Sequence, residues 1–73
     1  MKHFMFSIAG NKIDEYESEV SGTGPEYIHY EKSFGVEEVY YKLTDGKVSD
    51  VICEAFTLSS ATQVVNDFLS DLS

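Results

Sequence analysis

The chain has 73 residues and a formal net charge of −8, from 13 acidic residues against five lysines. This length allows one domain, 1–73, and a hydrophobic content of 42% is too high for a disordered protein. The acidic balance disfavours direct binding of nucleic acid and of an anionic membrane surface, because both of these attract cations.

Alternating apolar residues and turn signals predict five strands in chain order. The stretches "AGNK" and "TDGK" predict tight turns, because Gly10, Asn11 and the Asp45-Gly46 pair tolerate positive φ. Between the second and third strands, "SGTGPE" reads as a loop. The predicted strands cover residues 2–9, 13–21, 26–33, 37–44 and 47–57.

The last predicted element is a helix over residues 58–72. Its apolar residues recur at the spacing of one buried stripe: Ala61, Val64, Val65, Phe68, Leu69 and Leu72. Ser60 with Gln63 matches a capping box at its start. The expected fold is therefore α+β, an antiparallel sheet of about five strands with one C-terminal helix packed on one face.

The aromatic residues are expected mainly in the core between sheet and helix. The predicted sheet face under the helix consists of Phe4, Phe6, Tyr16, Ile28, Tyr30, Val39, Tyr41, Leu43 and Ile52. The segment "DVICEAF" conflicts with a simple alternation, because Val51 and Cys53 are as apolar as Ile52. Either a bulge near Asp50 switches the faces, or this strand is central and its second face is partly covered.

The most acidic stretch is "IDEYESEV", which carries Asp14, Glu15, Glu17 and Glu19 and no cation. On a strand, the three glutamates point to one side at about 6.6 Å spacing, which is too linear for one metal ion. We expect no metal site and no cofactor, because His3, His29 and Cys53 also lack ligand spacing. The row fits either protection of a sheet edge or a docking surface for a basic partner.

No enzymatic motif is present, and we expect a protein that is not an enzyme. Cys53 and His29 are the one candidate nucleophile and base. Cys53 lies in the apolar run "VICEAF", which favours a buried thiol. His29 alternates with Tyr27 and Glu31, which favours a solvated face.

The single cysteine predicts a reducing cytoplasm, because small secreted domains usually carry several disulfides. The apolar run in "MKHFMFSIAG" is too short for a signal peptide. Nor does any segment approach the roughly 20 apolar residues of a membrane span.

"IDEYESEV", "VEEVYY" and the charge of −8 resemble the small acidic proteins that bacteriophages use against host defences, the anti-CRISPR and anti-restriction proteins. The resemblance lies in size and composition across the chain. It implies an inhibitor in the host cytoplasm that acts as a nucleic-acid mimic, with carboxylates occupying sites meant for phosphates on a larger complex with a basic surface. The expected contact residues are Glu15, Glu17, Glu19, Glu37 and Glu38, with Tyr40 as an aromatic anchor.

A second hypothesis is a small regulatory or assembly module without mimicry. It would act through a sheet edge or through the apolar second face of the last strand, near Val51 and Ala55, and a homodimer is one form of it.

Overall fold

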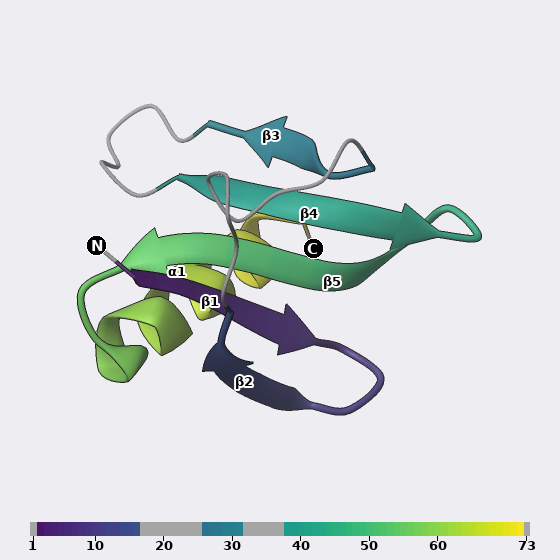
Figure 1. Cartoon of the computed structure of the whole chain (residues 1–73). Helices are drawn as coiled ribbons and strands as arrows, with labels where there is room; N and C mark the ends of the chain where they lie inside the picture. The colour runs from purple at the N-terminus through teal and green to yellow at the C-terminus, as the bar shows by residue number, and fades with distance from the viewer. Residues whose placement is uncertain (1, 17–25, 32–37, 73) are drawn as a thin grey trace.

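The computed structural model describes residues 2–16, 26–31 and 38–72, which form an antiparallel sheet with a helix on one face (Figure 1). The strand order is β2-β1-β5-β4-β3. This arrangement confirms the predicted α+β fold. The elements are β1 (Lys2–Ser7), β2 (Lys12–Glu15), β3 (Ile28–Tyr30), β4 (Val39–Thr44), β5 (Lys47–Ala55) and α1 (Leu58–Asp71).

The two predicted tight turns connect β1 with β2 and β4 with β5. Asp45 and Gly46 have φ of 54° and 78°, which agrees with the expected type I′ turn. In the other turn, Asn11 has a φ of 50°. The described parts of β2 and β3 are shorter than predicted, and positions 17–21 and 32–33 of those predictions lie outside the described residues.

β5 is the central strand, paired with β1 on one side and β4 on the other. Its residues Val51, Cys53 and Ala55 face the helix and are 0%, 0% and 2% exposed. Side chains on both faces of β5 are covered by other parts of the chain, since Ile52 on the second face is also 0% exposed. A strand that is covered on both faces needs apolar residues on both, which explains the apolar character of "DVICEAF".

A register shift also occurs near Asp50, where a bulge was the other predicted explanation. Lys42 pairs with Asp50, whereas Leu43 pairs with Val48, so Ser49 is an extra residue in β5. The Ser49 hydroxyl donates to the carbonyl oxygen of Lys42 at 3.4 Å. The bulge returns Val48 to the helix side, where it packs against the core.

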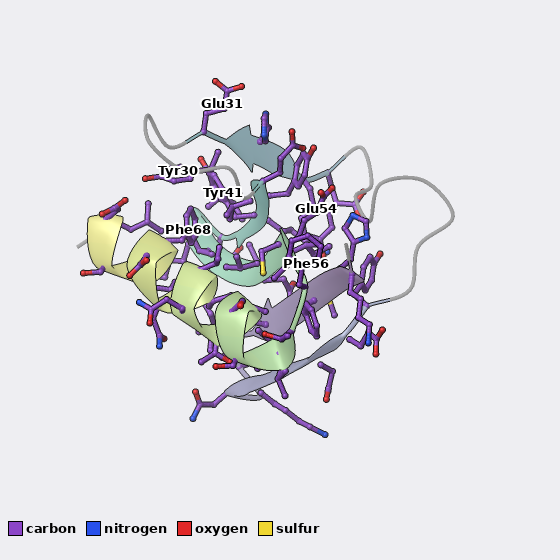
Figure 2. All side chains as sticks on the ribbon, turned by 90° about the vertical axis from the view of Figure 1, so that its left-hand side faces the viewer. Tyr30, Glu31, Tyr41, Glu54, Phe56 and Phe68 are labelled. Carbon is purple, nitrogen blue, oxygen red and sulfur yellow. The ribbon has the colours of Figure 1, made fainter. Side chains whose placement is uncertain are left out.

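The main core lies between the sheet and α1. Phe68 is 1% exposed and contacts Tyr30 edge-on, at 4.8 Å between ring centroids, and Tyr41 at 5.3 Å. Figure 2 shows these three rings between the helix and the sheet. The buried members of the cluster are Phe4, Val39, Val51, Cys53, Ala55, Ala61, Val65 and Phe68.

Ile52 was wrongly predicted to lie under the helix. It faces the opposite side of the sheet, between its cross-strand neighbours Met5 and Tyr40, and is nevertheless 0% exposed. The Tyr27 hydroxyl reaches the Met5 sulfur at 3.8 Å, so the Tyr27 side chain crosses this face towards β1. The error arose because parity along a strand does not reveal which apolar set faces the helix.

Three further residues of the predicted helix-side core are not buried there. Tyr16 lies outside the core cluster, and Ile28 and Leu43 are 44% and 43% exposed. Ile28 and Leu43 are exposed because α1 packs mainly against β5, β2 and β1. The helix side of the sheet is therefore less covered towards β4 and β3.

The helix begins earlier than the predicted capping box implies. Thr57 is the N-cap, with φ −136° and ψ 161°, and its hydroxyl accepts a hydrogen bond from the Ser60 backbone N–H at 3.1 Å. Gln63 does not cap the helix; its side-chain amide donates to Asp67 at 3.0 Å. Thr57 and Ser60 are both good capping residues by type, so residue type did not separate them.

Candidate functional site: an acidic face of the sheet

The structure describes three of the six predicted contact residues. These are Glu15, Glu38 and Tyr40, whereas Glu17, Glu19 and Glu37 lie outside the described residues.

Glu15 lies at the end of the edge strand β2. It pairs with Phe4, so it belongs to the helix side of the sheet, and its carboxylate lies 3.8 Å from the Lys2 ammonium. Glu38 and Tyr40 lie on the opposite face, with β1 and β5 between them and β2. The structure therefore joins Glu38 with Tyr40 and separates both from Glu15.

Tyr40 is held within a group of polar side chains. Its hydroxyl donates to Glu38 Oε2 at 2.8 Å, and its ring stacks on His29 at a centroid distance of 4.7 Å and 26° between planes. The His29 ring lies between two carboxylates, with Nδ1 3.7 Å from Glu31 and Nε2 4.0 Å from Glu38. The cross-strand pairing of His29 with Tyr40 creates this stack.

A second histidine–glutamate pair extends the group along the same face. His3 and Glu54 are cross-strand partners, and His3 Nε2 lies 3.1 Å from Glu54 Oε1. The backbone N–H of Glu54 donates to the Glu38 carbonyl at 3.1 Å, which links β5 to the start of β4. Figure 2 shows Glu54 on the side of the sheet away from the helix.

We call this group the acidic sheet patch: Glu31, Glu38, Glu54, Tyr40, His29 and His3. Sequence reasoning identified Glu38 and Tyr40 but missed the others. Their alternation with helix-facing residues was visible in the sequence. Their proximity depends on β5 lying between β1 and β4, which no local pattern reveals.

The charges of the patch act on its tyrosine. The hydrogen bond to the Glu38 carboxylate, followed by desolvation and the charges of Glu38 and Glu54, raises the pKa of Tyr40 above its ordinary value of 10.0. Among the described residues, the lysine ion pairs lie elsewhere, between Lys2 and Glu15 and between Lys12 and Asp14.

The candidate nucleophile and base do not meet. Cys53 faces the helix, where its thiol lies 3.9 Å from the Ala61 carbonyl oxygen, and His29 belongs to the opposite face of the sheet. Within residues 2–16, 26–31 and 38–72, no three side chains of His, Cys, Asp or Glu are placed to hold a metal ion. The patch offers a partner charge attraction, hydrogen bonding and aromatic contact.

Comparisons with protein-family models, with curated proteins and with solved structures give no match. Among the described helices, none is long and apolar enough to span a membrane.

Proposed function

We propose that this chain is a non-enzymatic binding protein that docks the acidic sheet patch onto the basic, nucleic-acid-binding surface of a larger protein. The observation that carries the proposal lies on the face of the sheet without a helix, where Glu38 and Glu54 act on Tyr40 and Glu31 lies beside the His29 ring that stacks on it. Carboxylates on such a face attract lysine and arginine, and Tyr40 offers an aromatic contact of the kind enriched at interfaces.

Phe56 supports an interface at this end of the sheet. Its side chain is 71% exposed, and it follows Glu54 by two residues, just beyond the end of β5. An exposed phenylalanine beside carboxylates can fill an apolar depression in a partner while the charges select a basic rim.

The proposed mechanism is inhibition by occupancy. The bound chain covers cations that would otherwise contact phosphates, so nucleic acid and this protein compete for one surface. The resemblance to phage anti-defence proteins supports a restriction or CRISPR complex as the partner and the host cytoplasm as the location.

The test measures nucleic-acid binding by purified restriction and CRISPR complexes with and without this protein, at about 50 mM and about 200 mM salt. We expect inhibition that weakens in high salt and disappears when Glu31, Glu38 and Glu54 are all changed to lysine. The matched variant changes Glu15, Glu17 and Glu19 to lysine, which adds the same charge outside the patch, and it should retain inhibition.

Circular dichroism of both variants shows whether each remains folded. If a folded patch variant inhibits as well as the unchanged protein, the patch is not the docking surface. If only the Glu15, Glu17 and Glu19 variant loses inhibition, the acidic stretch "IDEYESEV" is the contact instead.

The alternative of an assembly module through an apolar strand face has little support in the structure. Val51 and Ala55 are buried beneath α1, and Ile52 on the other face is fully covered within the chain. The edge strand β2 exposes Lys12, Asp14 and Glu15, and such charges disfavour pairing with another strand.

A further inference from the structure

A pocket lies on the helix side of the sheet, where α1 leaves β3 and β4 less covered. Its volume of about 310 Å³ is at the lower end of the range for small-ligand pockets. It lies on the face opposite the acidic sheet patch and is separate from it. Its lining includes Tyr30 of β3, Val39 of β4 and, from α1, Gln63, Val64, Asp67 and Phe68.

The pocket has a narrow apolar strip and an aromatic wall among polar side chains. Val64 of α1 is half-buried and contributes accessible apolar surface, above Val39 and Phe68, which are almost fully buried. Tyr30 is fixed at one side by its edge-on contact with Phe68 and by the hydrogen bond that its hydroxyl donates to Asp71 at 2.8 Å (Figure 2). An alkyl chain of a few carbons would bury part of its surface against this strip and the Tyr30 ring.

Asp67 places a carboxylate in the lining. Its Oδ1 accepts the hydrogen bond from the Gln63 amide at 3.0 Å, which holds the carboxylate towards the helix turn before it. Asp67 lies next to the last turn of α1, which contains no basic residue. The helix dipole at this end and the carboxylate both favour a cation, and none of the lining residues that the structure describes is a lysine.

The two ends of the pocket differ in polarity. Ser59 and Ser60 belong to the first turn of α1, where the helix dipole favours negative charge or neutral hydroxyl groups. A positive charge is therefore best accommodated at the Asp67 end, with Tyr30 available as a further partner through its ring.

We propose that this pocket binds an alkylammonium group, with the ammonium at Asp67 and the alkyl chain between Val64 and the Tyr30 ring. A free small-molecule amine and a lysine side chain of another protein share this chemistry. The proposal goes beyond the docking function above, because it uses the other face of the sheet and does not depend on the acidic sheet patch.

The test titrates the ¹⁵N-labelled protein with pentylamine and follows backbone amide shifts by NMR. We expect saturable shifts around Gln63, Val64 and Phe68, and weaker binding of pentanol and pentanoate, which match the chain length but lack the positive charge. Nα-acetyl-lysine methylamide is titrated in parallel. Either amine supports the proposal if it binds this pocket more tightly than pentanol and pentanoate do. The amine that binds more tightly of the two shows whether the pocket favours a free amine or a lysine side chain.

Asp67→Asn should weaken amine binding about three- to fivefold while leaving pentanol binding unchanged, as expected for loss of one exposed ion pair. Asp45→Asn is the matched control. It removes the same charge at the far hairpin, where the φ of 54° suits asparagine, and it should leave amine binding unchanged.

Three results would each overturn the proposal. The first is the absence of saturable shifts at the pocket, and the second is equal binding of pentylamine and pentanol. The third is an equal loss in Asp67→Asn and Asp45→Asn, which would show attraction to the net charge of −8 and no specific site. None of these results bears on the acidic sheet patch.

Discussion

At the scale of single residues, hydrogen bonds to carboxylates distinguish Tyr40 and Tyr30 from the other tyrosines. Tyr40 donates to Glu38 and Tyr30 donates to Asp71, both at 2.8 Å, and in each case this bond is the main cause of a raised tyrosine pKa. The raised pKa means that the folded chain favours the neutral phenol. The stabilisation is present below the ordinary tyrosine pKa of 10.0 and is lost as pH rises through the higher value in the folded state.

We predict that Glu38→Gln lowers the pKa of Tyr40 towards its ordinary value, because a neutral amide is a weaker acceptor and carries no charge. A pH titration of the Tyr40 ring resonances measures this change. Glu31→Gln removes the same charge without touching the Tyr40 hydroxyl and should have the smaller effect. Equal shifts in the two variants would contradict the role of the hydrogen bond.

At the scale of secondary structure, the two ends of each element were harder to predict than the element itself. The spacing from Ala61 to Leu72 indicates a helix without any knowledge of its neighbours. Its first residue depends on which hydroxyl accepts a backbone N–H, and Thr57 takes that role in place of Ser60. Likewise, Asp45-Gly46 predicts its turn from backbone sterics alone, because few residue pairs accept two positive φ values.

We predict that Thr57→Ala lowers the free energy of unfolding by about 1 kcal/mol, the usual cost of losing an N-cap. Denaturant unfolding measures this cost. Thr57→Ser keeps the hydroxyl and should be close to the unchanged protein. Ser60→Ala should cost less than Thr57→Ala, since the described bond of its hydroxyl is the 3.1 Å contact with the Thr57 hydroxyl. A larger cost for Ser60→Ala than for Thr57→Ala would show that Ser60 is the N-cap.

At the scale of the whole molecule, the sheet has apolar contacts on both faces. The larger core lies under α1, and a smaller one surrounds Ile52 beneath Met5, Tyr40 and Tyr27. Sequence patterns predicted the strands, the helix and the fold class. They could not predict the strand order, and so missed both the second buried layer and the meeting of Glu54 with Glu38. They also could not show that α1 packs mainly against β5, β2 and β1, which leaves the pocket beside Tyr30.

We predict that Ile52→Val lowers the free energy of unfolding by about 1 kcal/mol, within the range for removing one buried methylene group. Ile28→Val deletes the same group from a side chain that is 44% exposed and should cost only a few tenths of that amount. Denaturant midpoints with unchanged slopes compare the two. Equal costs would show that the face away from the helix is not a packed layer.

The pairing of β1 with β5 has a consequence for how the chain folds. β1–β2, β3–β4 and β4–β5 each pair neighbours in the sequence, whereas Lys2 pairs with Ala55 across most of the chain. Closing that long loop lowers the chain entropy before the contacts between β1 and β5 can stabilise it. The pairing of β1 with β5 is therefore expected to form late and to limit the folding rate. Substitutions in it should change the speed of folding more than those in the Asp45-Gly46 hairpin tip.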